Sequence, residues 1–206
     1  LGMEEGVIHF INQLSPSDSA EIVKFDSAVE VVQPFVAGDD SGKALLIDKV
    51  EEAWDYGRST RLYDAIYQAV EDLSFQHDAR RAVILLTDGV EYINEGDATS
   101  EHTFFEVKNY AISTGVPVFT IGIGTGVDEE GINSLANDTG GQYFDTLLAG
   151  HLSTIYQQLA QILFVDQYLL ICDSVFTSGD SVILNARVTL SEGGIGEDSR
   201  TILPCP

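Results

Sequence analysis

The sequence predicts an α/β fold: a doubly wound, mostly parallel sheet flanked by helices, with a C-terminal β appendage. Five consecutive apolar residues at 82–86 favour a central parallel strand covered on both faces, because a strand with one wet face would alternate. Helical and strand-like patterns alternate through residues 1–165, as in doubly wound domains. Residues 166–206 are strand-like only, so we expect them to form the appendage or the start of a β-sandwich domain.

Apolar spacing and turn residues define the elements expected in the first half of the chain. Apolar residues at helical spacing predict helices over residues 7–14, 44–54 and 62–73. Two strand-like runs predict a hairpin over 20–25 and 28–35, with Asp26 and Ser27 in its turn. We expect four residues of the second helix to reach the core: Leu45, Leu46, Val50 and Trp54.

The second half continues the alternation and then loses its helices. We expect strands over 81–87, 118–123 and 142–144, and helices over 103–113, 130–137 and 152–163. Beyond them, strand-like runs at 167–172 and 182–190 are joined by a turn at 177–180.

The charge of the chain excludes some classes of partner. Thirty-three acidic against ten basic side chains give a net charge of −23, which argues against binding to nucleic acid or to an anionic membrane. No apolar run approaches the roughly 20 residues of a membrane span. Such an acid excess serves solubility or life in a salty medium, or it recruits divalent cations.

Cys172 and Cys205 bracket the appendage. A disulfide between them would close a loop of about 33 residues and contribute roughly 3–4 kcal/mol to stability. This pairing would place the protein in an oxidising compartment, secreted or at the cell surface. Two unrelated buried thiols are the alternative.

We find no convincing catalytic constellation and expect the chain not to be an enzyme. The glycines at 122–126 follow a strand, but Val127 stands where a dinucleotide-binding loop needs its third glycine, which favours a flexible turn. No Gly-x-Ser-x-Gly motif occurs. The four histidines are scattered and are expected at the surface: His9, His77, His102 and His151.

Asp88 and Thr60 are the candidate metal ligands. Asp88 directly follows the apolar strand, where ligands bind in open α/β sheets, and Thr60 precedes a predicted helix. A carboxylate and a hydroxyl suit a hard cation such as Mg²⁺ or Ca²⁺. The alternative is that Thr60 caps the helix and Asp88 a turn. Three acids after the strand either add charge near the metal or belong to a solvated loop: Glu91, Glu95 and Asp97.

Five segments, taken in order, resemble a von Willebrand factor type A domain over about residues 1–164. The segments are Phe25–Val29, Ser59–Ala65, Ile84–Gly89, Val118–Gly124 and Leu135–Phe144. The resemblance implies a metal-ion-dependent adhesion site (MIDAS) fed by three loops, with Thr60 in the second and Asp88 in the third. The first-loop motif, Asp-x-Ser-x-Ser, is absent ahead of the helix at 7–14. We therefore expect residue 1 to lie within the helix that follows that motif.

The resemblance also implies how the domain works. A bound Mg²⁺ or Ca²⁺ would keep one position open for a carboxylate of a partner protein, making the chain an adhesion or scaffold module. The alternative function is a docking subunit of an enzyme or ATPase assembly. We expect a strand from outside residues 1–206, either an upstream or cleaved segment or a partner chain, to fill the central position. The C-terminal strand at 181–190 is a poorer candidate, because it alternates and suits a sheet with one wet face.

Overall fold

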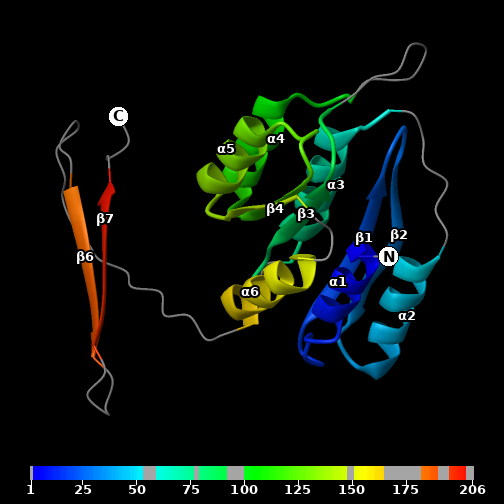
Figure 1. Cartoon of the computed structure of the whole chain (residues 1–206), viewed down its shortest axis with the longest axis horizontal. Coiled ribbons are helices and arrows are strands. Elements are labelled where there is room, and N and C mark those ends of the chain that lie inside the picture. The colour runs from blue at the N-terminus through cyan, green and yellow to red at the C-terminus, as the bar shows by residue number, and fades with distance from the viewer. Residues whose placement is uncertain are drawn as a thin grey trace. The chain divides into compact units, whose positions relative to one another are not determined.

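The computed structural model describes residues 2–52, 59–76, 79–91, 100–147, 151–164, 182–189 and 195–202. The chain divides into two compact units, Leu1–Val165 and Asp166–Pro206 (Figure 1). None of the described helices is long and apolar enough to cross a membrane.

The first unit alternates helices and strands, which confirms the predicted α/β class. Its helices are α1 (Gly2–Ile11), α2 (Asp40–Glu51), α3 (Leu62–Ser74), α4 (Phe104–Thr114), α5 (Glu129–Thr139) and α6 (Leu152–Phe164). Its strands are β1 (Ser19–Phe25), β2 (Val29–Ala37), β3 (Val83–Thr87), β4 (Val118–Ile123) and β5 (Tyr143–Thr146). Strands β3, β4 and β5 form a parallel sheet, and β1 and β2 form the predicted antiparallel hairpin.

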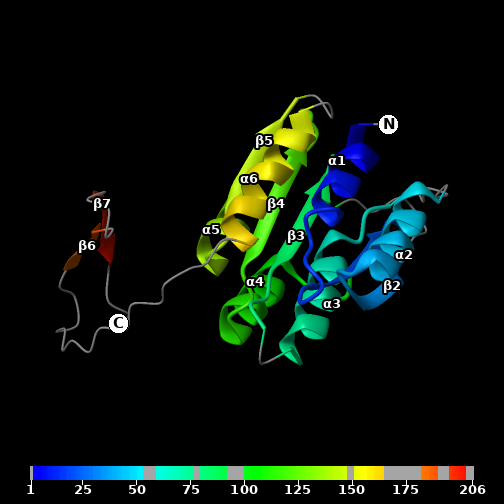
Figure 2. The same cartoon turned by 90° about the horizontal axis from the view of Figure 1, so that it is seen from below.

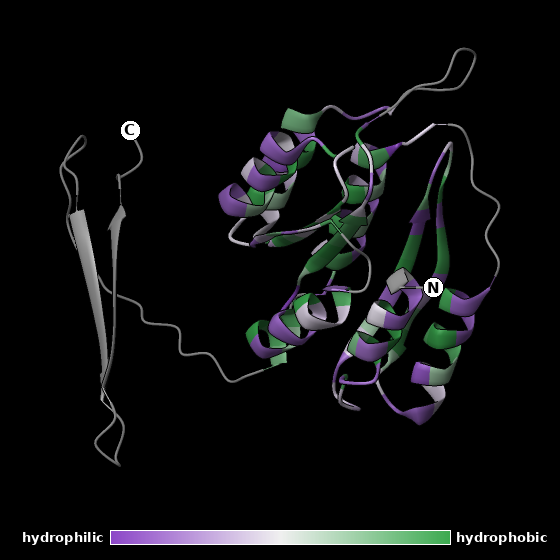
Figure 3. Ribbon diagram, viewed as in Figure 1, coloured by the Kyte–Doolittle hydropathy of each residue, from purple (hydrophilic) through white to green (hydrophobic). Residues whose placement is uncertain are grey.

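Helices cover both faces of the parallel sheet. On β3, Val83 and Leu85 pack in a core with α3, α4 and α5. Ile84 and Leu86 pack on the opposite side, against a cluster that includes α6 and is also joined by residues of α1. Figure 2 shows α1 and α6 side by side, and Figure 3 shows hydrophobic colour along the strands of this unit. The apolar run at 82–86 is therefore covered on both faces, as its composition predicts.

The carboxyl ends of β1 and β3 meet the same end of α3. The N–H of Arg61 donates to the carbonyl of Asp26, just beyond β1, over 2.8 Å. The N–H of Tyr63 donates to the carboxylate of Glu91, beyond β3, over 3.2 Å.

At the other end of α3, Arg81, just before β3, donates to the carbonyl of Leu73. Glu21 of β1 contacts Asp72 at the same end. Both strands therefore run antiparallel to α3 and in the same direction as each other.

Among the described strands, β1 pairs only with β2, and β3 pairs only with β4. The expectation that 82–86 is the central strand of one continuous sheet therefore needs correction: within the described residues β3 is an edge strand. One edge of β1 and one edge of β3 lack a partner in this part of the structure.

Helix α1 runs parallel to α6. A Cβ on Gly6 would come within 2.9 Å of Leu152, at the start of α6, whereas the ring of Phe10 lies 5.3 Å from that of Phe164 at its end. Since α6 begins just after the carboxyl end of β5, α1 also begins at the carboxyl edge of the sheet.

Helix α2 begins four residues earlier than its apolar pattern predicts. The carboxylate of Asp39 accepts the N–H of Gly42 over 2.8 Å and caps the helix there. Leu46 and Val50 are buried as predicted, but Leu45 is 51% exposed, so its assignment to the core was wrong. Trp54 lies outside the described residues.

The second unit contains an antiparallel pair, β6 (Val182–Thr189) and β7 (Ile195–Ile202). Strand β6 was predicted, whereas β7 was missed because its sequence is largely polar and charged. The predicted strand at 167–172, the turn at 177–180 and both cysteines lie outside the described residues.

Candidate metal-binding site at the carboxyl edge of the sheet

Thr60 lies in a loop held against the turn of the β1–β2 hairpin. Its neighbour Ser59 is only 3% exposed, and the Ser59 N–H donates to the hydroxyl of Ser27 over 3.1 Å. On the other side, Arg61 is tied to the Asp26 carbonyl. Arg61 is the N-cap of α3, and no side chain caps the helix there by accepting a backbone N–H. Thr60 therefore does not cap the helix, which removes one alternative explanation for it.

Asp88 follows β3 directly and exposes its side chain. Thr87 closes the turn instead: its hydroxyl accepts the N–H of Gly89 and donates to the Gly89 carbonyl, both over 3.2 Å. The loop after β4 lies close by, since a Cβ on Gly126 would come within 3.0 Å of the Asp88 carbonyl oxygen. The carboxylate of Asp88 is thus not needed to hold the turn.

Glu91 connects the loop after β3 to the first turn of α3. Its carboxylate accepts the Tyr63 N–H at the end of the helix where the dipole favours negative charge. Burial raises the pKa of the Tyr63 hydroxyl, and the carboxylates of Glu91 and Asp128 raise it further. Two carboxylates, those of Glu91 and Asp128, therefore lie near the first turn of α3. Glu91 is engaged in this contact, while Glu95 and Asp97 lie outside the described residues.

The donor set fits part of a hard-cation site. Thr60 and Asp88 offer a hydroxyl and a carboxylate, and they belong to the two loops that meet α3. Mg²⁺ and Ca²⁺ take six or more oxygen ligands, so these two residues need further ligands. The described residues contain no group of three or more His, Cys, Asp or Glu side chains that could hold an ion.

A buried carboxylate lies one turn of helix beyond Thr60. Asp64 is 8% exposed and accepts hydrogen bonds from the Arg61 guanidinium, the N–H groups of Glu101 and His102, and His102 Nδ1. Burial alone would raise the pKa of Asp64, but the hydrogen bonds from His102, Glu101 and Arg61 outweigh it and lower the pKa.

Sequence reasoning missed this cluster. His102 was expected at the surface, but its ring is half-buried, bonds to Asp64 and stacks on Tyr67 at a centroid distance of 3.7 Å. The only sign of the cluster in the sequence is the position of Asp64 in the first turn of α3. A carboxylate there is equally consistent with a favourable interaction with the helix dipole.

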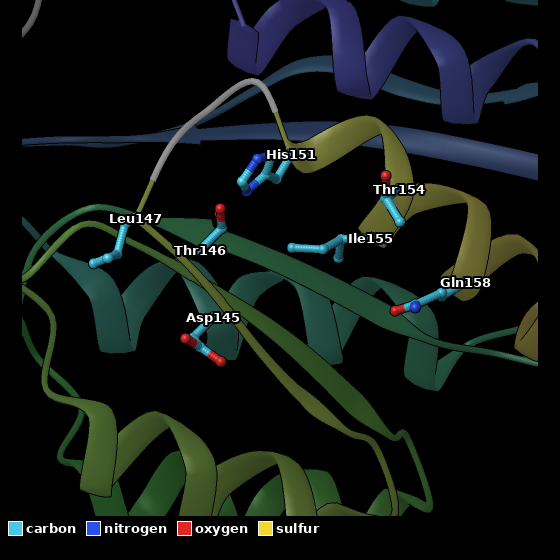
Figure 4. A pocket seen from close by; sticks show the side chains of 7 residues that line it. All are labelled: Asp145, Thr146, Leu147, His151, Thr154, Ile155 and Gln158. Carbon is cyan, nitrogen blue, oxygen red and sulfur yellow. The ribbon is translucent and has the colours of Figure 1, made fainter.

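Two other features lie at the carboxyl ends of β4 and β5. The glycine-rich turn after β4 contains Gly124 at φ +78°, a conformation that favours glycine and explains the residue without a ligand. A shallow hollow at the end of β5 is lined by His151, Asp145 and their neighbours. In Figure 4 the Asp145 side chain points away from His151, so these two groups do not converge on a ligand.

Comparison with known proteins gives one family. The model of the von Willebrand factor type A domain matches residues 3–158. No curated protein matches significantly.

Solved structures share the fold at low sequence identity. A von Willebrand factor type A protein from Catenulispora acidiphila is 18% identical, with a TM-score of 0.67, over 77% of this chain and 37% of that chain. Proximal thread matrix protein 1 from the mussel byssus, solved with a zinc-occupied MIDAS motif, is 18% identical with a TM-score of 0.59, over 78% of this chain and 42% of that chain. The ArnB paralog VWA2 from Sulfolobus acidocaldarius is 18% identical, with a TM-score of 0.52, over 73% of this chain and 37% of that chain. The chain thus spans about two-fifths of the length of each.

Proposed function

Since this chain belongs to the von Willebrand factor type A family, we propose that its first unit is a metal-ion-dependent protein-binding module of the adhesion or scaffold kind. One observation carries the proposal: the loops that contain Thr60 and Asp88 meet at the N-terminal end of α3. The mussel protein, a structural neighbour, was solved with a zinc-occupied MIDAS motif, which supports metal binding by this fold.

In this proposal Thr60 and Asp88 hold Mg²⁺ or Ca²⁺ through their side-chain oxygens. The bound ion supplies an open coordination position for a carboxylate of the partner protein. Ser59 and Arg61, anchored to the hairpin turn, fix the backbone on both sides of Thr60. The net charge of −23 raises the local concentration of divalent cations.

We propose in addition that one further strand lies between β1 and β3. The two strands are parallel, and each has an edge without a partner among the described strands. Buried N–H and C=O groups left unpaired cost roughly 1–3 kcal/mol each. Helix α1 shares one apolar cluster with β3 and another with β1, and it begins at their carboxyl edge. A helix in that position is the crossover of a right-handed parallel β-α-β unit. We therefore assign the gap to an upstream strand, whose loop brings the remaining ligands to the same edge.

The proposal also covers the class and location of the protein. A module that binds a partner through a metal needs no catalytic group, so we propose a binding protein rather than an enzyme. Two cysteines bracketing one small unit favour a secreted or cell-surface protein.

Calorimetric titration with Mg²⁺ and Ca²⁺ tests the site in the intact polypeptide that includes the upstream strand. Thr60→Ala and Asp88→Ala should each weaken binding, because each removes an oxygen ligand. Asp145→Ala and Thr154→Ala are matched controls, since both side chains are exposed and line the hollow at the end of β5, which includes neither Thr60 nor Asp88. Unchanged affinity in both site variants would refute the assignment of Thr60 and Asp88.

A further inference from the structure

Asp64 has more hydrogen-bond partners than a helix needs in its first turn. Its carboxylate accepts Arg61 Nε at 2.8 Å, the Glu101 N–H at 2.9 Å, the His102 N–H at 3.0 Å and His102 Nδ1 at 2.8 Å. A buried charge requires such compensation, so Asp64 is retained in the interior only because these groups surround it.

These bonds tie together the two loops proposed to hold the metal. Glu101 and His102 lie at the end of the connection that begins with Asp88, and Asp64 fastens that end to α3. Near its start, the same connection is fastened to α3 by Glu91. Both described ends of this connection, at Glu91 and at Glu101 and His102, are therefore bonded to the first turn of α3.

The Thr60 loop depends on the same carboxylate. Arg61 is the residue after Thr60. Its guanidinium donates a hydrogen bond to the carboxylate of Asp64, and its backbone N–H donates to the carbonyl of Asp26. The side of the cluster away from Arg61 is packed as well, because the His102 ring stacks on Tyr67, which stacks on Tyr110 at a centroid distance of 4.7 Å.

We propose that Asp64 is a positioning residue for the metal site: it touches no metal, but it fixes the Thr60 loop and the Asp88 connection relative to each other. This inference rests on the proposed function. Residues that hydrogen-bond to metal ligands and orient them typically contribute to metal affinity, which falls by about 10–100-fold when they are removed. We expect a loss of that size on Asp64→Ala.

The experiment must separate positioning from general stability. Asp64→Ala removes the anchor, and Asp64→Asn keeps its shape but loses its charge. Leu135→Ala is the control: it truncates a buried core residue of α5 that makes none of these hydrogen bonds. Affinity for Ca²⁺ and Mg²⁺ is measured by calorimetry in the intact polypeptide, at a temperature where circular dichroism shows each variant folded. Hydrogen exchange of the Glu101 and His102 amides is measured without metal.

Support consists of faster exchange at these two amides and an affinity loss in the Asp64 variants, with wild-type affinity in Leu135→Ala. If Asp64→Ala does not fold, Asp64→Asn and His102→Ala decide the matter by the same readouts. Wild-type affinity in the folded Asp64 variants, combined with loss in Asp88→Ala, overturns this inference alone. An equal loss in Leu135→Ala also overturns it, because the effect would then be general. Absence of metal binding in the wild type overturns the proposed function and this inference together.

Discussion

Raising the pH from 4.5 to 8 should lower the unfolding free energy of the first unit. The cause is a pair of neighbouring carboxyl groups, Glu21 on β1 and Asp72 on α3. Burial, followed by the charge and hydrogen bond of Asp72, raises the pKa of Glu21 from 4.5 to about 7. Asp72 is held by the amide of Gln68, which donates to its two oxygens over 3.1 and 3.0 Å. Glu21 therefore binds its proton more tightly in the folded chain than in the unfolded chain.

The sign and size of the effect follow from linkage. The contribution of a group with a raised pKa is fully present below pH 4.5 and is lost as the pH rises through about 7. A pKa shift of this size, from 4.5 to about 7, corresponds to about 3 kcal/mol of unfolding free energy. Because Glu21 is only partly buried, solvent screening reduces this, and we expect about 1–2 kcal/mol. Three carboxylates have a lowered pKa: Asp64, Glu106 and Asp138. Their contributions to stability are lost as the pH falls, in a more acidic range, so they do not cause a decline between pH 4.5 and 8.

Urea unfolding at a series of pH values measures this effect. Glu21→Gln should flatten the decline of the unfolding free energy between pH 4.5 and 8, because an amide does not titrate. Glu30→Gln, an exposed position on the neighbouring strand β2, should leave the decline as in the wild type. If Glu21→Gln and the wild type lose stability in parallel across this range, the carboxyl pair does not cause the decline.

Two further predictions concern packing and the appendage. Leu46→Ala should lower the unfolding free energy by about 2–5 kcal/mol, because Leu46 is fully buried against α1. Leu45→Ala, at the exposed neighbour, should change it by less than about 0.5 kcal/mol, and equal losses in urea titrations would contradict the burial. Cys172 and Cys205 should be oxidised to one another, because no other cysteine competes. Mass spectrometry of the unreduced protein checks this pairing, and two free thiols after purification in air would count against it.

Most of the first unit could be predicted because its elements carry strong periodic signals. Helix α3 was located within one residue by its apolar spacing, and the hairpin by two strand-like runs around Asp26 and Ser27. The start of α2 was missed because the Asp39 cap, not the apolar pattern, sets it. Strand β7 was missed because its partner β6, rather than any alternation of its own, defines it.

The site was less predictable than the fold. Position along the chain placed Thr60 before a helix and Asp88 after a strand, but it could not show that Arg61, not Thr60, is the N-cap of α3. Nor could it show the Asp64 cluster, because its partner His102 lies 38 positions away in sequence. Long-range hydrogen bonds of this kind leave no periodic trace, so only the three-dimensional structure shows them.

Hydrogen exchange of the intact polypeptide, with and without Ca²⁺ or Mg²⁺, tests the central claim most directly. Metal should slow exchange at the amides beside the two ligand loops, including Gly89 and Arg61. Amides at the opposite end of the sheet, such as Val118 at the start of β4, should be unaffected. Exchange that is unchanged by metal at Gly89 and Arg61, or slowed equally throughout the unit, would contradict a metal site at the carboxyl edge.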